Sequence, residues 1–279
     1  MIHVLNATYA AATLGLVVLG LAIVFGWLGV MNMAHGEFVM LGAYSAVIAQ
    51  SAGWRPLASI PIALLLCGSV GAAVEWAVMS RLYRRPFDTL LATWGLSILM
   101  RKCVELVFGR EYRSLDQTLT GPVSILGVGY PAYRVALVVA IFATFGALYV
   151  WYRRSATGAR IQAMVVNPEL AASLGIDTAR LARSAFVFGT ATAGLAGALL
   201  APLVRVEPFM GIDYLLMSFF ALVVGGLGSF EGLVIGSGTI GGGDSLASAL
   251  FGNTGGYLTV LGISILFLWL KPRGLHGRR

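Results

Sequence analysis

The chain has 279 residues, of which 58% are hydrophobic and 11% are charged, and its formal net charge is +7. A soluble domain carries roughly 25% charged residues, so this composition excludes a water-soluble fold and indicates an integral membrane protein. The 36 glycines agree with this class, because small residues let membrane helices approach closely. We therefore interpret the net positive charge as a sign of membrane topology and expect no nucleic-acid partner.

Apolar runs predict an all-α, polytopic transmembrane helical bundle of about eight or nine spans, in a single domain over residues 1–279, because a spanning helix needs about 20 apolar residues. We expect helices at Ala7–Val30, Phe38–Ala52, Leu57–Ser80, Thr89–Phe108, Tyr133–Tyr152, Ser184–Val204, Tyr214–Leu227, Leu233–Phe251 and Tyr257–Leu270. The second and seventh runs are short.

The seventh run ends in a glycine-rich stretch that contains Gly225, Gly226 and Gly228. Short runs interrupted by glycine are typical of a broken or re-entrant helix beside a transport path. A tight turn between two tilted helices explains the same pattern. Glu231 follows this bend, and the sequence leaves both interpretations open.

Lysine and arginine predict the orientation. They gather in three segments, 81–85, 153–183 and 271–279. If every run spans, all three segments lie on one side, which the positive-inside rule assigns to the cytoplasm. The N-terminus is then outside and the C-terminus is cytoplasmic. Arg101 and Lys102 fall in the outer half of the fourth run, where we expect them to reach outward towards the membrane surface.

Two connections are long. Gly109–Ala132 is external under this scheme, and it either meets an extracytoplasmic partner or simply joins two helices. The cytoplasmic loop 153–183 contains a short helix at about residues 167–175. Asn167 suits the N-cap, Pro168 the first helical position and Gly175 the left-handed position after the helix. Glu169 places negative charge at the positive end of the helix dipole.

This short helix cannot be stable by itself, because isolated helices need about 12 residues or more. Leu170, Ala171 and Leu174 would share one face and pack against something. That partner is either a groove on another protein or the membrane and the helices of the same chain.

Polar residues between the first two runs are candidates for a translocation path or gate. Asn32, His35 and Glu37 would form an inner gate or cap the second helix, and we expect them near the cytoplasmic surface. Trp94 either lines a path for a small solute or packs as an ordinary aromatic. The cysteines and histidines show no metal-ligand spacing, and we expect no cofactor.

Four separated segments resemble motifs of one family. Leu28–Tyr44 is similar to the first motif of the branched-chain amino acid permease family of ABC importers, and Gly158–Asp177 resembles the segment that couples this family to its ATPases. Val223–Gly232 is similar to its late glycine-rich motif, and Lys271–Leu275 to its C-terminal close. The resemblance covers nearly the whole chain.

This resemblance implies a non-catalytic permease subunit in a bacterial inner membrane. It implies a second permease, homologous or identical, two cytoplasmic ATP-binding subunits and an extracytoplasmic solute-binding protein. The chain has no Gly-x-x-x-x-Gly-Lys-Ser/Thr loop, which ATP hydrolysis would require. The resemblance assigns ATPase coupling to Asn167, Pro168, Glu169, Leu170, Ala171, Leu174 and Gly175.

The substrate stays open. Arg85–Ser97 is similar to the urea-transporting branch of the family, so the expected cargo is a branched-chain amino acid or a related small solute such as urea or a short amide. The alternative is an autonomous channel or an ion-coupled carrier for a small polar solute. That alternative would use the carboxylates of Glu75, Glu105 and Asp244, which otherwise reach water or pair with neighbouring cations.

Overall fold

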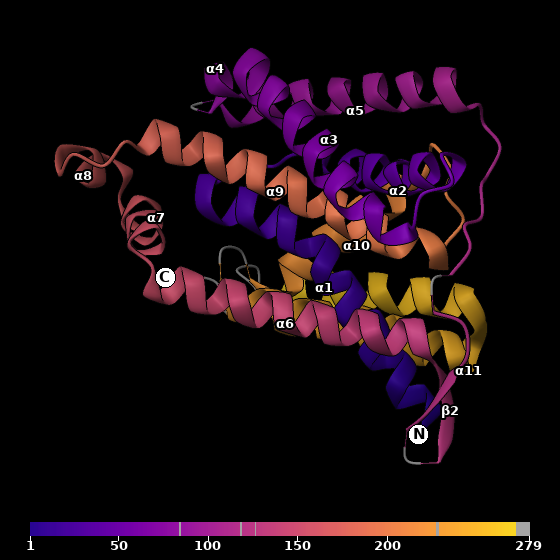
Figure 1. The fold of residues 1–279 in the computed structure, drawn as a ribbon. Coiled ribbons are helices and arrows are strands. Elements are labelled where there is room, and N and C mark those ends of the chain that lie inside the picture. The colour runs from indigo at the N-terminus through magenta and orange to yellow at the C-terminus, as the bar shows by residue number, and fades with distance from the viewer. Residues whose placement is uncertain (84, 118, 126, 227–228, 272–279) are drawn as a thin grey trace.

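The computed structural model describes residues 1–279 except 84, 118, 126, 227–228 and 272–279, and it is dominated by helices (Figure 1). In chain order the elements are α1 (Ile2–Leu28), α2 (His35–Ser51), η1 (Pro56–Ala58), α3 (Ser59–Val74), η2 (Glu75–Met79), α4 (Ser80–Leu82), α5 (Pro86–Phe108), β1 (Pro122–Ile125), β2 (Val128–Pro131), α6 (Ala132–Arg154), α7 (Ala156–Val166), α8 (Pro168–Ser173), α9 (Thr178–Leu200), η3 (Ala201–Leu203), α10 (Met210–Gly225) and α11 (Phe230–Leu270).

The predicted all-α membrane bundle is confirmed. Five helical segments of the described chain are long and apolar enough to cross a bilayer: Ile2–Leu28, Ser59–Leu82, Ala132–Arg154, Thr178–Leu203 and Phe230–Leu270. The helix α10 is shorter, α2 has 17 residues, and α5 contains four charged side chains. The expected number of eight or nine full spans therefore stays a prediction.

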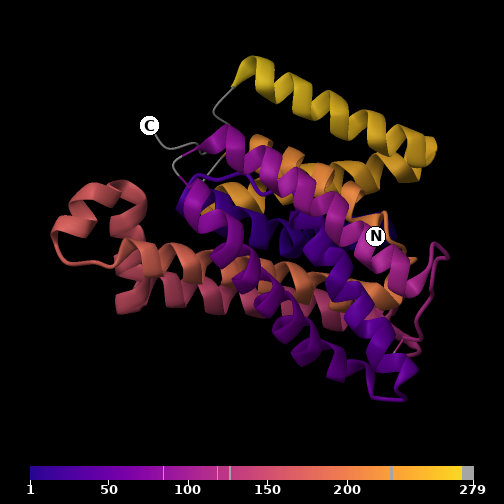
Figure 2. The ribbon, with the colours of Figure 1, turned by 90° about the horizontal axis from the view of Figure 1, so that it is seen from above.

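The longest helix, α11, contains the last two predicted runs. Gly252 interrupts its helical backbone with a φ of 77°. A Cβ on Gly256 would collide with Asp244 and Ser248, which lie on the other side of this break. The two arms therefore fold back on each other, as the view from above shows (Figure 2).

Glycine contacts hold the centre of the bundle together. Gly42 of α2 lies against the carbonyl of Gly194 in α9, and Gly197 lies against the carbonyl of Val39. Gly20 of α1 meets the carbonyl of Gly189 in the same way. A side chain at any of these glycines would overlap backbone atoms, so the small residues let α1 and α2 pack directly on α9.

The helix α5 lies at the edge of the bundle (Figure 1). Its buried residues are Thr89, Thr93, Ser97, Met100 and Val104, while its large apolar side chains, such as Leu91, point outward. The buried side of α5 is therefore more polar than its exposed side, which is the reverse of a helix in a soluble protein.

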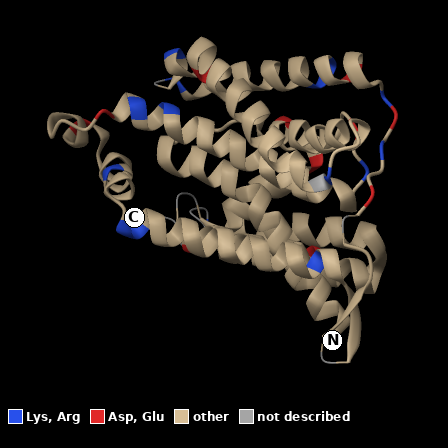
Figure 3. Ribbon diagram, viewed as in Figure 1, with Lys and Arg blue, Asp and Glu red and all other residues tan. Residues whose placement is uncertain are grey.

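The two ends of the bundle differ. At one end β1 and β2 form an antiparallel hairpin, which the sequence did not predict, and the Tyr130 hydroxyl donates to Asn6 Oδ1 over 3.0 Å. At the other end α7 and α8 project from the bundle. Lys and Arg residues predominate at this second end, as the blue segments of the ribbon in Figure 3 show, whereas acidic and basic residues mix at the side of the hairpin.

Candidate functional site

The segment between α1 and α2 returns into the bundle before α2 starts. Gly29 ends α1 with a φ of 68°, and residues 29–34 are not helical. Asn32 forms two hydrogen bonds just before α2. Its Oδ1 accepts from the Ala34 amide over 3.0 Å, and its carbonyl accepts from the His35 amide over 3.2 Å. These bonds form a compact turn of the kind that asparagine favours.

His35 shows how deep this turn lies. Its Nε2 is 2.9 Å from the carbonyl oxygen of Val17, and its side chain is fully buried. Val17 lies eleven residues before the last residue of α1, which is about 16 Å along the helix axis. The expected position near the cytoplasmic surface is therefore wrong for His35. The prediction failed because it assumed that α2 begins where α1 ends.

Glu37 forms the most buried ion pair among the described residues. Arg101 of α5 donates from Nη2 to Glu37 Oε1 over 2.8 Å, and the Ser97 hydroxyl donates to the same oxygen over 2.9 Å. The side chain of Glu37 is 2% exposed and that of Arg101 is 15% exposed. The expectation that Arg101 reaches outward is wrong, because a buried carboxylate on α2 binds its guanidinium instead.

The second oxygen of Glu37 faces a different helix. Oε2 is buried and has no hydrogen-bond partner in the described part of the chain. It lies against Gly211 at the start of α10, where an added Cβ would be 2.9 Å from it. The backbones of Gly36 and Gly211 also touch. Glu37 thus lies at the junction of α2, α5 and α10.

We call the contacts of α5 with Glu37 of α2 and with Met33 just before it the polar seam, which the α5 residues Thr93, Ser97 and Arg101 form. The Met33 amide donates to Thr93 Oγ1 over 3.1 Å, which adds a bond beside the ion pair. The three α5 residues recur every four positions and so lie on one face. This spacing is visible in the sequence, but the sequence does not show which helix the polar face meets.

The other predicted gate residues lie elsewhere. Trp94 is 58% exposed and neighbours Thr93 in sequence, but it is on the outer side of α5. Gly225 packs against the carbonyl of Gly232, and Gly226 has a φ of 103°. The end of α10 therefore packs directly against the start of α11. Gly228 lies outside the described residues.

Glu231 is exposed in the first turn of α11, where Ser229 caps the helix by accepting from the Gly232 amide over 2.9 Å. Gly225 lies fourteen residues after Gly211, which is about 21 Å along α10. Gly211 touches Glu37 at one end of α10 and Gly225 touches Gly232 at the other, so the first turn of α11, with Glu231, is well separated from the polar seam.

The predicted helix in the internal loop is present as α8. Asn167 Oδ1 accepts from the Leu170 amide over 3.0 Å, and Pro168 is the first helical residue. Gly175 has a φ of 83° and its amide donates to the Ala172 carbonyl over 3.0 Å. The expected caps are confirmed. The preceding helix α7 was not expected; Ser155 caps it through a bond from the Gly158 amide.

The face expected to contain Leu170, Ala171 and Leu174 is divided. Ala171 is buried against the chain, whereas Leu170 is 57% exposed and Leu174 is 72% exposed. Val166, at the end of α7, is exposed as well. We call Val166, Leu170 and Leu174 the apolar tip. Figure 1 shows α7 and α8 projecting beyond the other helices, so the apolar tip lies at the far end of the loop.

A groove of about 1230 Å³ separates this projection from the ends of α1 and α4. Its lining includes Trp27, Arg81, Tyr83 and Glu169. The groove places charged and aromatic side chains beside α8.

The fold and these two sites define a class: an all-α, multi-pass membrane protein with a buried polar seam and a projecting capped helix. The chain matches the family model "Branched-chain amino acid transport system / permease component" over residues 3–270, and it belongs to this family. It is therefore a multi-pass, non-catalytic permease component of an ABC transport system of the inner membrane.

Curated relatives match over nearly their full length. The chain is 28% identical to the high-affinity branched-chain amino acid transport system permease protein LivH of Escherichia coli K12, covering 98% of this chain and 94% of that protein. It is 27% identical to BraD of Pseudomonas aeruginosa, covering 99% and 95%. A probable LivH of Methanocaldococcus jannaschii is 28% identical over 94% and 88%.

Among solved structures, PsaBC from Streptococcus pneumoniae in complex with a Fab has a similar fold. The TM-score is 0.54 at 11% sequence identity, and the match covers 98% of this chain and 93% of that chain. At this identity the likeness concerns the fold alone.

Proposed function

We propose that the chain, with a second homologous or identical permease, forms the pore of an ABC importer in a bacterial inner membrane. Cytoplasmic ATP-binding subunits supply the energy and an extracytoplasmic binding protein delivers the solute. The N-terminus lies outside and the C-terminus in the cytoplasm. The observation that carries this proposal is the apolar tip, formed by the end of α7 and the capped helix α8, at the basic end of the bundle.

The geometry of α8 suits docking to another protein. Asn167 and Gly175 fix the two ends of the helix, and the buried Ala171 anchors it to the chain. Leu170 and Leu174 are left on the outside, where they expose apolar surface to water unless a partner covers them. A preorganised element with exposed apolar residues loses little conformational entropy on binding.

The substrate that we favour is a branched-chain amino acid, because relatives that cover almost the whole chain carry this activity in their names. Urea or a short amide is the second candidate. It rests on the similarity of Arg85–Ser97 to the urea-transporting branch of the family. Uptake of radiolabelled leucine and urea by the assembled transporter, measured in parallel, separates the two.

We further propose that the polar seam is the gate of this permease. Hydrogen bonds and an ion pair hold α5 there, and such contacts can be exchanged for contacts with water or a polar solute. The tightly interlocked glycine contacts of the centre offer no such exchange.

The autonomous channel or ion-coupled carrier is less well supported. Glu105 is bonded to Lys102 and Arg110, and Glu75 lies 3.9 Å from Arg183. Carboxylates that already face cations are poor sites for a coupling cation. Uptake by the purified chain alone in liposomes, without ATP-binding subunits, would establish this alternative.

The docking role is tested in the reconstituted transporter with Glu169→Arg. We expect normal membrane insertion but loss of ATP-dependent uptake, because the new positive charge opposes the dipole in the first turn of α8 beside the apolar tip. The matched control is Glu111→Arg, the same change at an exposed site on the hairpin side. Full uptake by Glu169→Arg vesicles would refute the docking role.

Gly175→Pro is a second test of the same role. Proline cannot adopt the φ of 83° and removes the amide that bonds Ala172, so α8 loses its end. Gly53→Pro makes the same change at a φ of 70°, where the Gly53 amide bonds Gln50 at the other end of the bundle. We expect only Gly175→Pro to abolish ATP-driven uptake.

A further inference from the structure

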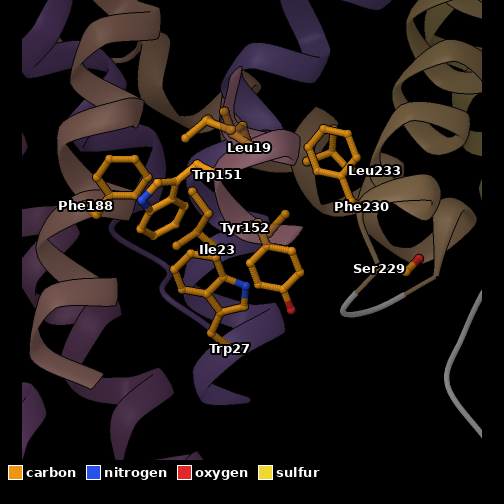
Figure 4. Close-up of a pocket in the computed structure, with 11 residues that line it drawn as sticks. Leu19, Ile23, Trp27, Trp151, Tyr152, Phe188, Ser229, Phe230 and Leu233 are labelled. Carbon is orange, nitrogen blue, oxygen red and sulfur yellow. The ribbon is translucent and has the colours of Figure 1, made fainter. Parts of the chain in front are cut away.

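A pocket lined mainly by aromatic and aliphatic side chains lies where four helices meet, and Figure 4 shows how its residues face one another. It is apart from the polar seam and from the apolar tip. Its principal lining residues are Ile23 and Trp27 of α1, Trp151 and Tyr152 of α6, Phe188 of α9 and Phe230 of α11.

The aromatic residues form the rim of the pocket. Trp27 and Tyr152 stack with ring centroids 5.7 Å apart and an interplanar angle of 7°. The ring centroids of Trp151 and Phe188 are 6.4 Å apart. Trp27 belongs to the last turn of α1 and Tyr152 to the last turn of α6, so the rim lies at the basic end of the bundle. Tryptophan and tyrosine concentrate at this level of a bilayer.

Positive charge lies immediately beyond the rim. Arg153 and Arg154 end α6 and are exposed. The Arg153 guanidinium lies 5.8 Å from the ring centroid of Tyr149, and no carboxylate pairs with either arginine in the part of the chain that the structure describes. None of the residues that line the pocket is acidic. The site thus combines an apolar interior with a cationic edge.

We propose that this pocket binds an anionic phospholipid, with part of an acyl chain between the aromatic rings and the phosphate at Arg153 and Arg154. Basic clusters beside helices on the cytoplasmic side attract anionic head groups. The amphipathic rings of Trp27 and Tyr152 suit the boundary between the two parts of such a lipid. A protein segment in the same place would bury two arginines for which it must supply acidic partners.

The site also contacts the base of the projecting loop. The Tyr152 carbonyl accepts from Gln162 Nε2 of α7 over 2.7 Å, and Gly158 packs directly on the same carbonyl. A bound lipid would therefore brace Tyr152, and through it the helix that supports α8. This inference goes beyond the proposed function and does not depend on the identity of the transported solute.

The test uses the purified permease in detergent with added phosphatidylglycerol or phosphatidylcholine, and native mass spectrometry counts the lipids that remain bound. We expect wild-type protein to retain phosphatidylglycerol. The double variant Arg153→Gln/Arg154→Gln should retain about tenfold less, since each arginine near an anionic head group contributes to its attraction.

The matched control is Arg180→Gln/Arg183→Gln, which removes two charges from the same end of the protein, at the start of α9. It should retain phosphatidylglycerol as wild-type protein does. Ala22→Leu fills the pocket without changing charge, because Ala22 lines it, and should also lose the lipid. Circular dichroism and gel filtration establish that each variant is folded.

Three outcomes would overturn the proposal. The first is equal retention of phosphatidylcholine and phosphatidylglycerol by wild-type protein. The second is an equal loss of lipid from the two arginine double variants, which would show general charge attraction only. The third is cross-linking of Trp151→Cys to a second copy of the chain, which would show that a protein surface fills the pocket. Full ATP-driven uptake by Glu169→Arg vesicles with unchanged lipid binding would contradict only the docking role in the proposed function.

Discussion

Two helices pack against α2 in opposite ways. The helix α9 meets α2 through glycines, with Gly42 against the carbonyl of Gly194 and Gly197 against the carbonyl of Val39. The helix α5 meets α2 through the polar seam, in which Ser97 and Arg101 donate to Glu37. One contact depends on the absence of side chains, and the other depends on three particular side chains.

The difference indicates which part is scaffold. Helices in lipid gain little from burying apolar surface against each other, so close van der Waals packing has to hold them together. Glycine contacts supply this packing only at one distance and one register. Polar contacts tolerate exchange of partners, so we interpret α9 as the fixed support of α2 and α5 as the helix that can move.

The largest effect is expected at the glycine contact. Gly42→Leu places a side chain on the carbonyl of Gly194, and we expect it to abolish folding because backbone atoms cannot move aside. Gly95→Leu is the matched control on α5, where no atom lies within 4 Å of an added Cβ. The measurement is the yield of monodisperse protein in detergent. Similar yields for both variants would contradict the interpretation that α9 is a fixed support and α5 a helix that can move.

A smaller effect is expected at the ion pair. Arg101→Leu leaves the buried Glu37 carboxylate unpaired, and we expect a loss of about 3–5 kcal/mol in the free energy of unfolding. Glu37→Gln added to Arg101→Leu should restore most of this loss, since no buried charge remains. Thermal unfolding in micelles gives both values. A double variant as unstable as Arg101→Leu would show that the charge of Glu37 is not the cause.

A still smaller effect is expected for Thr93→Val, which keeps the shape of the side chain and removes the acceptor for the Met33 amide. We expect a loss of about 1 kcal/mol, as for a typical hydrogen bond. Hydrogen exchange at Met33 should become faster. Thr144→Val is the control, because the Thr144 hydroxyl bonds only within its own helix to the Ala140 carbonyl. An unchanged exchange rate of the Met33 amide would show that this hydrogen bond does not contribute to the polar seam.

The smallest effect on stability is expected at Trp94, on the outer side of α5. Trp94→Leu should change the free energy of unfolding by less than about 0.5 kcal/mol, because exposed positions away from specific contacts contribute little. Uptake assays decide its role in transport. A strong loss of uptake with unchanged stability would place Trp94 beside the translocation path.

The features that the sequence predicted correctly are mostly local. The caps of α8 depend on Asn167 and Gly175, which are at most a few residues from the groups they bond. The apolar runs likewise depend only on composition along the chain. The ion pair escaped prediction because Glu37 and Arg101 are 64 residues apart, so only the packing of α5 on α2 joins them.

The depth of α2 escaped prediction for a related reason. Hydropathy locates apolar segments but does not say where in the bilayer a helix begins. The bond between His35 and Val17 sets the level of α2, and it joins residues 18 positions apart. Neither α7 nor the β1–β2 hairpin follows from hydropathy, because both lie in the polar connections between the apolar runs.

The position of Glu37 has a consequence for the timing of any movement. Its Oε1 depends entirely on α5, while its Oε2 faces the bare backbone of Gly211. If α5 moved away in a dry interior, one negative and one positive charge would be stranded in apolar surroundings at once, at a cost of several kcal/mol for each ion. We therefore expect α5 to separate from Glu37 only as water reaches the two charges.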